Sequence, residues 1–421
     1  MKNKEIKIIG DLMIDEWIYG DYDKKSAEGN LKIFENNKSE TSLGGVGFLC
    51  TNLKNLKINF KLFCNIGNDN LGRKTIEKLK KRRINFDFVK NKKNSILKKR
   101  YFYKNKQIFR CDEEKLKDEK DTGIKFLRNL DEGDTVIISD YKKGSIYKKL
   151  HETIIKKKCT TFVDPKNDPS FYKNAFLVKP NMPKFKEWCG GFSNKKAFTL
   201  IKKMGWSWLI ISNSDSGVYV YNKLGQKRFF KVKKINNPNV IGAGDIFFSG
   251  LIYFHLKNYD IFTAAELSSY AASKCVSKKF MREVHLKDFK KDIIFTNGVF
   301  DILHRGHLDL LKFAKRNCRK LIVGINSDSS VKLNKGKSRP YNSLKKRISK
   351  LRKTKLIDQI LVFKDKTPIK LINKIKPDAI IKGSDYKQNQ VVGKKISNII
   401  IFEKKNNLSS TRILNKMRNG S

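Results

Sequence analysis

Segment 295–307 constrains the fold more than any other part of the chain, because it places two histidines in the pattern His-x-Gly-His directly after an apolar run. Residues 293–295 predict a buried strand, and the Thr-Asn-Gly turn at 296–298 ends it. A helix starting near His304 would aim its first N–H groups and both imidazoles at the carboxyl end of a sheet. The pattern therefore predicts an α/β fold with a site for an anion.

Three further elements suited to binding phosphate follow in the C-terminal third. Residues 321–325 predict the next buried strand, and Asn-Ser-Asp at 326–328 would lie at its carboxyl end. The loop 335–340 is basic and contains a glycine, which suits it to gripping phosphate. Ser-Ser-Thr at 409–411 offers hydroxyls and a helix N-terminus to a triphosphate.

The histidine pair predicts a reaction that needs no general base. A phosphate oxygen that attacks the α-phosphorus of a nucleotide is already an anion, so the site has only to position and neutralise. We assign His304 and His307 to the α-phosphate and pyrophosphate, with charge neutralised or bound from neighbouring elements by Lys312, Arg339 and Ser410. One histidine would be an ordinary polar helix start, but two at this spacing make that alternative the minor one.

A Gly-Ala-Gly-Asp segment at 242–245 opens an apolar helix farther back in the chain. Backbone N–H groups at such a helix start hold a phosphate, and Asp245 would take a proton from an attacking hydroxyl. Taken alone the motif is weak, because an aspartate near a helix N-terminus is common structural chemistry. Its position downstream of Gly44-Gly45 and Asn181 strengthens the prediction.

Together these motifs resemble the family of bifunctional heptose 7-phosphate kinases and heptose 1-phosphate adenylyltransferases of lipopolysaccharide core biosynthesis. In the C-terminal third the resemblance runs over residues 293–413 and includes segments 296–307, 326–331, 339–340, 367–368, 382–386 and 409–411. The His-x-Gly-His core alone would fit any cytidylyl- or adenylyltransferase. The Lys-Gly-Ser-Asp-Tyr segment at 382–386 and the attached sugar kinase narrow the resemblance to the heptose family.

The first two-thirds of the chain resemble a ribokinase-type sugar kinase. This resemblance rests on an opening strand, a charged stretch before Gly44 that would form a lid, and strand ends at 136–144, 162–166 and 178–181. It implies a ribokinase-like three-layer α/β kinase domain with a β lid at 1–287, followed by a Rossmann-like His-x-Gly-His nucleotidyltransferase domain at 288–421. Family members often dimerise through the lid, so we expect a homodimer. Packing at the lid base is an equal alternative role for the aromatic residues 101–103.

The resemblance also implies substrates and site residues. ATP with Mg²⁺ would phosphorylate heptose 7-phosphate at C1, and ATP would then adenylylate heptose 1-phosphate, so small molecules are the expected partners. Besides Asp245, His304 and His307, the expected sugar-binding residues are Asp11, Asp15, Gly44, Gly45, Lys99, Arg100, Arg110, Asp112 and Asp140. The expected nucleotide-binding residues are Asn181, Gly242, Ala243, Gly244, Thr296, Asn297, Gly298, Phe300, Lys312, Asn326, Asp328, Arg339, Ser409, Ser410 and Thr411. Metal ligands stay open.

Three positions depart from the family pattern in the kinase half. Phe48 stands where the family carries an asparagine for the sugar, Lys184 where a glutamate would help organise Mg²⁺, and Ile241 where a threonine precedes Gly-Ala-Gly-Asp. Two interpretations follow. The chain is either a two-step enzyme, or an adenylyltransferase whose kinase domain serves as a scaffold.

The net charge of +51 raises a third hypothesis, a basic nucleic-acid-associated protein built on degenerate enzyme domains. However, basic clusters such as 80–83 and 156–158 are short and scattered. No zinc-finger spacing, basic-zipper heptad or RNA-binding aromatic motif accompanies them. The abundance of Asn, Ile and Phe favours drift under A/T-rich codon bias. We therefore expect no specific nucleic-acid partner.

The cysteines predict a reducing compartment, because the seven are odd in number, dispersed and free of any Cys-x-x-Cys pair. We expect them to be small core residues. The charged N-terminus does not resemble a signal peptide, and no apolar stretch approaches the roughly 20 residues of a membrane span. A cytoplasmic enzyme without membrane contact is the expectation.

Overall fold

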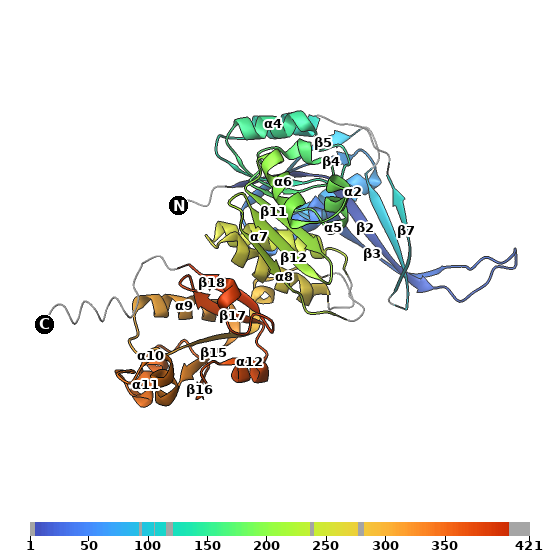
Figure 1. Cartoon of the computed structure of the whole chain (residues 1–421). Coiled ribbons are helices and arrows are strands. Elements are labelled where there is room, and N and C mark those ends of the chain that lie inside the picture. Colours follow the sequence, from blue (N-terminus) through green and yellow to red (C-terminus); the bar gives the residue numbers. More distant parts are fainter. Residues whose placement is uncertain are drawn as a thin grey trace. The chain divides into compact units, whose positions relative to one another are not determined.

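The computed structural model describes residues 5–91, 95–104, 106–114, 121–235, 240–276 and 282–403. Its contacts divide the chain into two compact units. The first comprises Met1–Tyr259 with Ala271–His285, and the second comprises Asp260–Tyr270 with Leu286–Ser421. Figure 1 shows that both units alternate helices with strands. The expected domain boundary between residues 287 and 288 stays a prediction.

A nine-stranded sheet forms the centre of the first unit, in the order β13-β12-β11-β10-β9-β8-β1-β4-β5. Its strands are β1 (Ile6–Gly10), β4 (Phe60–Gly67), β5 (Phe86–Asn91), β8 (Thr135–Ser139), β9 (Thr160–Asp164), β10 (Leu177–Val178), β11 (Trp208–Asn213), β12 (Gly217–Asn222) and β13 (Lys227–Phe230). The sheet is parallel from β5 to β11, but β12 and β13 pair antiparallel. The connections 214–216 and 223–226 are too short for a parallel crossover, which needs a dozen or more residues.

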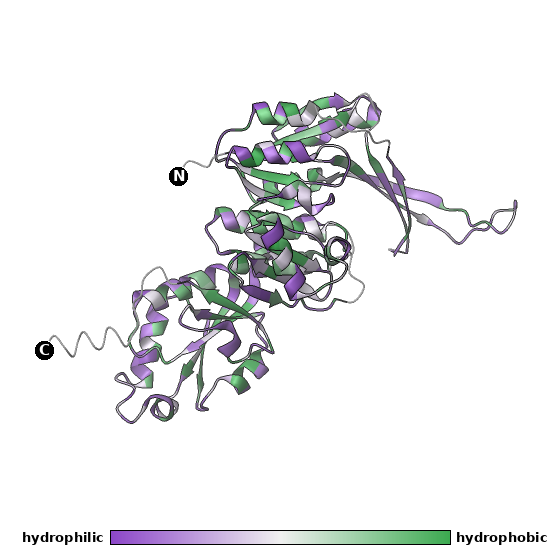
Figure 2. Ribbon diagram, turned by 45° about the horizontal axis from the view of Figure 1, so that its top comes forward, coloured by the Kyte–Doolittle hydropathy of each residue, from purple (hydrophilic) through white to green (hydrophobic). Residues whose placement is uncertain are grey.

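Helices enclose this sheet, and Figure 2 shows its hydrophobic strands among helices with hydrophilic outer residues. They are α1 (Val46–Asn55), α2 (Asn70–Lys81), α3 (Asp121–Arg128), α4 (Lys148–Lys156), the short 3₁₀ helix η1 (Pro169–Tyr172), α5 (Met182–Cys189), α6 (Asn194–Met204) and α7 (Ala243–Leu256). Helix α8 (Ile261–Val276) is divided between the two units, with its residues up to Tyr270 in the second. Local signals fix their ends. In α6, Ser193 caps the first turn by accepting from the Lys196 N–H, and Gly205 ends the helix in the left-handed conformation.

The lid is a separate four-stranded sheet in the order β3-β2-β6-β7. Its strands are β2 (Leu12–Asp21), β3 (Glu35–Gly45), β6 (Leu97–Tyr103) and β7 (Lys106–Glu113), and Figure 1 shows them extending from the main sheet. The expected lid strands are therefore present. A bulge shifts the β2–β3 register between Tyr19 and Gly20, and another shifts β6–β7 between Tyr101 and Phe102.

The lid aromatics divide between two roles. Phe102 is buried and stacks on Trp17, with ring centroids 5.6 Å apart. Tyr101 instead stacks on Phe109, at 4.3 Å, and Phe109 is 50% exposed. Packing at the lid base thus accounts for Phe102 alone, and the Tyr101–Phe109 pair reaches the surface.

The cysteines mostly occupy core positions, as expected. Five are buried and all seven are free thiols. Cys189 is half-buried, and Cys111 is exposed, so the expectation is wrong for Cys111. Cys111 lies on β7, an edge strand of the lid whose residues are nearly all exposed.

The second unit has a five-stranded parallel sheet in the order β16-β15-β14-β17-β18. Its elements are η2 (Leu286–Phe289), β14 (Lys291–Gly298), α9 (Arg305–Arg316), β15 (Cys318–Asn326), α10 (Asp328–Lys335), α11 (Leu344–Lys353), β16 (Gln359–Phe363), α12 (Ile369–Ile375), β17 (Ala379–Gly383), η3 (Gln388–Gln390) and β18 (Asn398–Phe402). Successive residues of β14 serve opposite faces. Ile294 packs with Leu311 of α9, whereas Phe295 packs with Ile372 of α12. This is the expected Rossmann-like arrangement.

A buried ion pair ties residues 260–270 to the second unit. Lys291 Nζ lies 2.6 Å from Glu266 Oε1, and both side chains are 1% exposed. The Lys291 ammonium also lies 4.3 Å from the centroid of the Tyr270 ring, and the Asn398 side-chain amide donates to Glu266 Oε1. Because a buried charge is tolerated only with its partner, α8 and β14 depend on each other here.

Glu266→Ala should lower the free energy of unfolding of the second unit by about 3–5 kcal/mol, because it leaves the Lys291 charge buried alone. The double variant E266L/K291M, which removes both charges, should recover most of that loss. Hydrogen exchange of the β14 amides measures the effect in this unit directly. Equal protection in the single and double variants would contradict the role of the pair.

Candidate active sites

Helix α7 begins at the Gly-Ala-Gly-Asp segment, as the motif predicts. Gly242 is its N-cap with a φ of 76°, and a Cβ there would lie 2.5 Å from the Phe48 ring, so only glycine fits. The Ala243 N–H donates to the Val240 carbonyl at 3.2 Å, so a phosphate gains this donor only when the turn opens. Asp245 lies in the first turn of the helix.

The Asp245 carboxyl lies among charged and polar groups from several strands. The Tyr141 hydroxyl donates to its Oδ1 at 3.0 Å. Burial raises the pKa of Asp245 to about 7, and the Asp164 carboxylate adds to this shift, whereas Lys179 and the Tyr141 hydrogen bond oppose it. A carboxyl with a pKa near 7 suits a general base that works at neutral pH.

Two residues that the sequence analysis missed complete this cluster. Lys179 Nζ lies 3.0 Å from Asp164 Oδ2 and 3.5 Å from the Gly244 carbonyl oxygen, and Lys179 is buried. Asp164 ends β9 and Lys179 follows β10, which are neighbours in the parallel sheet. Charged residues at the carboxyl ends of consecutive predicted strands were the available signal.

A cavity of about 230 Å³ lies beside Asp245, lined by Met13, Asp15, Gly45, Phe48, Lys98, Arg100, Tyr141, Ile241, Gly242 and Asp245. Within it, Arg100 donates from Nε and Nη2 to Asp15 Oδ1 at 3.2 and 3.0 Å. Gly44 allows the lid strand to pass close to this pair, because a Cβ there would lie 2.2 Å from Asp15 Oδ2. The cavity thus joins carboxylates and cations, as a sugar phosphate site requires.

Neighbouring lysines of β6 point to opposite faces of the lid. Lys98 lines the cavity, with its ammonium 5.6 Å from the centroid of the Tyr141 ring. Lys99, the residue expected from sequence, pairs with Glu113 at 2.5 Å on the other face. Strand alternation explains the difference, because Lys98 shares its face with Arg100. The sugar-binding role expected of Lys99 stays a prediction.

Arg110 and Asp112 of β7 share the face of Lys98 and Arg100, since they lie directly opposite them in the register. Their side chains pair with each other at 2.7 Å. Both residues are exposed. The structure therefore places them on the correct face, but outside the lining of the cavity.

Asp11 is buried and organises the turn after β8. Its carboxylate accepts from the N–H groups of Tyr141, Lys143 and Ser145 at 2.8, 3.0 and 3.1 Å. Burial and the neighbouring Asp140 carboxylate raise the pKa of Asp11, although these hydrogen bonds oppose the shift. The structure thus gives Asp11 a role in holding backbone, and its expected contact with sugar stays a prediction.

Asp140 holds a second set of loops together. Its carboxylate accepts from the N–H groups of Lys142 and Asn167 at 2.7 and 3.0 Å, and from the Tyr172 hydroxyl. The residue is 2% exposed. Like Asp11, Asp140 holds loop backbone in place near the site. Its expected role in sugar binding stays a prediction.

Asn181 and Lys184 lie at the start of α5. Asn181 Oδ1 caps the helix by accepting from the Lys184 N–H at 2.9 Å. The Lys184 ammonium pairs with Glu187, one turn later, at 2.8 Å. The position where a glutamate would help organise Mg²⁺ therefore carries an ion pair.

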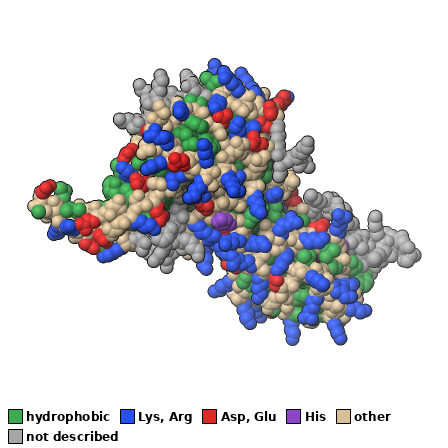
Figure 3. Space-filling model, turned by 180° about the vertical axis from the view of Figure 1, so that it is seen from behind, with side chains coloured by type: hydrophobic (Ala, Val, Ile, Leu, Met, Phe, Trp, Pro, Cys, Tyr) green, Lys and Arg blue, Asp and Glu red, His purple; other side chains and the backbone are tan. Residues whose placement is uncertain are grey.

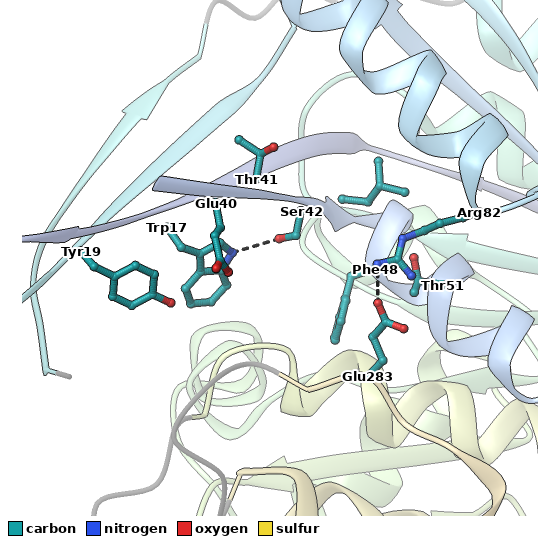
Figure 4. A pocket seen from close by; sticks show the side chains of 10 residues that line it. Trp17, Tyr19, Glu40, Thr41, Ser42, Phe48, Thr51, Arg82 and Glu283 are labelled. Atoms are coloured by element: carbon teal, nitrogen blue, oxygen red, sulfur yellow. Dashed lines mark hydrogen bonds and ion pairs between the residues drawn. The ribbon is translucent and has the colours of Figure 1, made fainter. Parts of the chain in front are cut away.

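Phe48 separates two cavities. It is buried and lines both the Asp245 cavity and a second one of about 140 Å³. Figure 4 shows the second cavity, where Trp17 Nε1 donates to Ser42 Oγ at 3.0 Å and Arg82 pairs with Glu283 at 2.5 Å. Its remaining lining residues are Tyr19, Glu40, Thr41, Leu43 and Thr51. The Phe48 ring thus occupies the position where the resembled family carries an asparagine for the sugar.

In the second unit, both histidines lie where the motif predicts. His304 is the N-cap of α9, and its ring stacks on that of His307 with centroids 3.8 Å apart. Phe300 packs against His307 at 5.1 Å. Phe300 is buried and has a φ of 51°, an uncommon conformation for a bulky residue. One helix start therefore presents both imidazoles together.

Arg347, which the sequence analysis missed, connects the loops around this site. It is wholly buried and donates to the carbonyls of Val299, Asn326 and Asn342 at 2.8, 2.9 and 3.1 Å, and to Asp328 Oδ1 at 2.6 Å. Burial alone would raise the pKa of Asp328, but the hydrogen bonds from Arg347 and the Leu344 N–H, with the charges of Arg347 and Lys332, together outweigh it and lower that pKa. Asn326 and Asp328 thus act here as structural partners of the arginine.

Arg339 is held by a second buried carboxylate. Its Nη1 lies 3.0 Å from Asp301 Oδ2, and Asp301 also accepts from the N–H groups of Tyr341 and Asn342 at 3.0 and 2.9 Å. Arg339 is thereby fixed next to the loop that follows β14. Its expected contact with a nucleotide stays a prediction.

Lys382 marks the end of β17 next to the Thr-Asn-Gly turn. Its Nζ donates to the Asn297 carbonyl at 2.7 Å, and burial lowers its pKa to about 8. Thr296 is also buried, and its hydroxyl donates to the Ile381 carbonyl at 2.9 Å. Gly298 ends β14. The Lys-Gly-Ser-Asp-Tyr segment thus adjoins the predicted nucleotide turn.

Some of the expected site residues lie at the surface or outside the described residues. Lys312 is exposed on α9. Ser409, Ser410 and Thr411 lie outside the described residues. Within the described ranges, no group of three His, Cys, Asp or Glu residues could hold a metal ion. No helix of the described chain is long and apolar enough to cross a membrane.

Solved structures share the fold of the first unit. Phosphofructokinase-2 from Escherichia coli aligns with a TM-score of 0.59 at 14% identity, covering 68% of this chain and 96% of that one. Ribokinase from Thermotoga maritima aligns with a TM-score of 0.56 at 17% identity, covering 68% and 97%. The expected ribokinase-like fold is confirmed.

Sequence comparison assigns both halves. Residues 3–284 match the pfkB family of carbohydrate kinases, and residues 295–416 match the cytidylyltransferase-like family. The fold and the two sites therefore define a carbohydrate kinase joined to a nucleotidyltransferase. The bifunctional protein HldE of a Nitratiruptor species is 32% identical over 98% of this chain and 99% of its own length. That of Campylobacter jejuni is 32% identical over 98% and 97%.

The chain belongs to the HldE family of bifunctional proteins. The resemblance expected from the motifs is confirmed, as is the prediction of an enzyme with kinase and nucleotidyltransferase domains.

Lys98→Ala should raise the KM of the kinase for its sugar substrate roughly ten- to a hundredfold, the worth of one charge-assisted hydrogen bond. Lys99→Ala is the matched control, one residue away on the opposite face, and should change KM by less than about threefold. Steady-state kinetics at saturating nucleotide measures both. A larger effect from Lys99→Ala would show that the lid presents its other face to the sugar.

Proposed function

We propose that the first unit phosphorylates D-glycero-β-D-manno-heptose 7-phosphate at C1 with ATP. The second unit then transfers adenylyl from ATP to heptose 1-phosphate, giving ADP-heptose for the lipopolysaccharide core. The observation that carries the kinase step is the Asp245 carboxyl, with a pKa of about 7, beside a cavity lined by Lys98 and Arg100. The choice of heptose rests on the motifs shared with that enzyme family.

In the kinase step, the anomeric hydroxyl oxygen attacks the γ-phosphorus of ATP while Asp245 takes its proton. An O–P bond forms to the sugar, and the bond from the γ-phosphorus to the bridging oxygen of ADP breaks. The start of α7 lies toward the transferring phosphate, where Gly244 and Asp245 offer backbone N–H groups. Lys179 supplies a buried positive charge next to this helix start.

In the transferase step, an oxygen of the sugar 1-phosphate attacks the α-phosphorus of ATP, and pyrophosphate leaves. The nucleophile is already ionised, so the residues only position and neutralise. His304 and His307 would meet the phosphates at the start of α9, with Arg339 on an adjoining loop and Lys382 near the end of strand β17. Ser410 would join them from the C-terminal segment.

Nucleotide and metal are proposed with this function. The α5 start does not fit a Mg²⁺ ligand, because Asn181 caps the helix and Lys184 pairs with Glu187. No step is therefore assigned to a metal held there. Mg²⁺ would enter with the phosphates of ATP, as it commonly does when few protein ligands are available.

Two alternatives remain less favoured. A scaffold kinase domain is motivated by Phe48, Lys184 and Ile241, yet Asp245 keeps a hydrogen bond from Tyr141, and Lys179 pairs with Asp164 nearby. A nucleic-acid-associated protein is motivated by the charge, yet Figure 3 shows Lys and Arg side chains spread over the visible surface of both units, with no single stripe. Proteins that bind nucleic acid typically gather Lys and Arg in a patch or stripe on one face or along one helix. We also propose a cytoplasmic location, in keeping with seven free thiols.

The test of the proposal is a phosphorus NMR time course with the purified chain, Mg-ATP and heptose 7-phosphate, followed by a run with heptose 1-phosphate. An anomeric phosphate signal and then a sugar diphosphate signal in the first run would support both steps. A diphosphate only in the second run would mean that the kinase domain is a scaffold. No product in either run would overturn the proposal.

Asp245→Asn should abolish phosphorylation and leave adenylylation measurable, because it removes the base from one site alone. His307→Ala should do the reverse, at a cost of about 3–4 kcal/mol in the transition state, or a loss of a hundredfold or more. The same NMR assay reads both. Equal loss of the two activities in either variant would contradict separate sites, and a loss under tenfold for His307→Ala would make His307 structural.

A homodimer through the lid is proposed from the half-exposed Tyr101–Phe109 stack, which Phe34 meets edge-on at 5.2 Å. Phe109→Asp should shift the chain toward monomer in sedimentation equilibrium, because it puts a charge into the apolar patch. Leu224→Asp, at a residue 76% exposed in the β12–β13 turn, is the control and should leave the dimer intact. A monomeric wild type would rule the dimer out.

A further inference from the structure

The turn after β8 carries a tyrosine whose position is set by buried charge. Residues 141–145 are held by the Asp11 carboxylate through three N–H groups, at 2.8 to 3.1 Å. The Asp11 N–H in turn donates to the Ser139 carbonyl at 3.2 Å. Because Asp11 is 2% exposed, water does not compete for these contacts. The Tyr141 backbone therefore has little freedom.

The Tyr141 side chain reaches across the cavity to the reactive carboxyl. Its hydroxyl donates to Asp245 Oδ1 at 3.0 Å, and the Lys98 ammonium lies over its ring. A carboxylate with one oxygen held by a fixed donor presents the other oxygen in a fixed direction. Asp245 lies in the first turn of α7, and the Tyr141 hydroxyl is a donor from outside that helix.

We infer that Tyr141 is a positioning residue of the kinase site, which holds the Asp245 carboxylate in line for the sugar hydroxyl and is itself held by Asp11. The inference rests on the proposed function, since it assumes that Asp245 accepts the sugar proton. It goes beyond that function by assigning a role to Tyr141 and by making Asp11 act through it.

Several charged groups face Asp245 and set the pH at which it works. The Asp164 carboxylate at the end of β9 raises its pKa, as does the more distant Asp15 of β2, whereas Lys179 after β10 lowers it. Lys98 and Arg100 of β6 line the same cavity. The Tyr141 hydrogen bond also lowers this pKa, because it favours the ionised carboxylate.

Tyr141→Phe removes only the hydroxyl. The kcat for phosphorylation should fall about tenfold, as expected for loss of one oriented hydrogen bond, while KM for both substrates stays within about twofold. The pKa of Asp245 should rise, so the base is protonated at higher pH. The acid limb of the kinase pH profile should therefore move up by roughly half to one pH unit.

The chain provides two controls. Adenylylation of heptose 1-phosphate by the same sample should be unchanged, which shows that Tyr141→Phe is folded. Tyr221 lies on β12, and its hydroxyl donates to Asn194 Oδ1 at 2.8 Å. Tyr221→Phe removes this hydroxyl and should leave the pH profile unchanged. An acid limb that does not move in Tyr141→Phe, or a parallel loss of both activities, would overturn the inference.

The link to Asp11 is tested by a double-mutant cycle. Asp11→Asn weakens the turn and should lower kcat, and the D11N/Y141F double variant should be no slower than Tyr141→Phe alone. Additive losses, or a rise in sugar KM from Asp11→Asn, would show that Asp11 acts directly on the sugar and would overturn its part. If the wild type phosphorylates no sugar phosphate, the proposed function itself is overturned. If the wild type is active but the acid limb of the Tyr141→Phe pH profile does not move, only the inference about Tyr141 is overturned.

Discussion

Backbone groups at the carboxyl ends of parallel strands impose the constraint on which both sites depend. Loops leave the sheet there with N–H and carbonyl groups that no neighbouring strand can satisfy, and burial makes each unmet group costly. In the first unit, the Asp11 carboxylate satisfies three backbone N–H groups of such a loop by accepting hydrogen bonds from them. In the second unit, the Arg347 guanidinium donates to three backbone carbonyls and one carboxylate. Because the loop backbone is fixed, the reactive side chains on these loops are held in fixed positions too.

The two sites then use their buried charge differently. In the proposed kinase site, burial and the Asp164 carboxylate raise the pKa of Asp245 to about 7, and the Lys179 charge opposes this shift. The proposed transferase reaction needs no base, and its site stacks two imidazoles at one helix start. Each arrangement suits the proposed nucleophile, which is a neutral hydroxyl in one reaction and an anion in the other.

Local features of both sites were predictable from sequence, and long-range ones were not. The starts of α7 and α9 follow from short motifs whose glycines and caps act within a few residues. Arg347 looked like one more cation of a lysine-rich helix, because its partners lie up to 48 residues away. The choice of Lys98 over Lys99 depends on strand register, which the sequence of one strand does not fix.

The two lid bulges have a consequence for how this sheet can change. They lie beyond Asp15 on β2 and beyond Arg100 on β6, on the side of the lid tip. A bulge absorbs one extra residue locally, so a shift in register near the tip stops before it reaches the cavity. The tip can therefore gain or lose residues over generations while Lys98 keeps facing inward, which leaves it the part of the lid free to diverge.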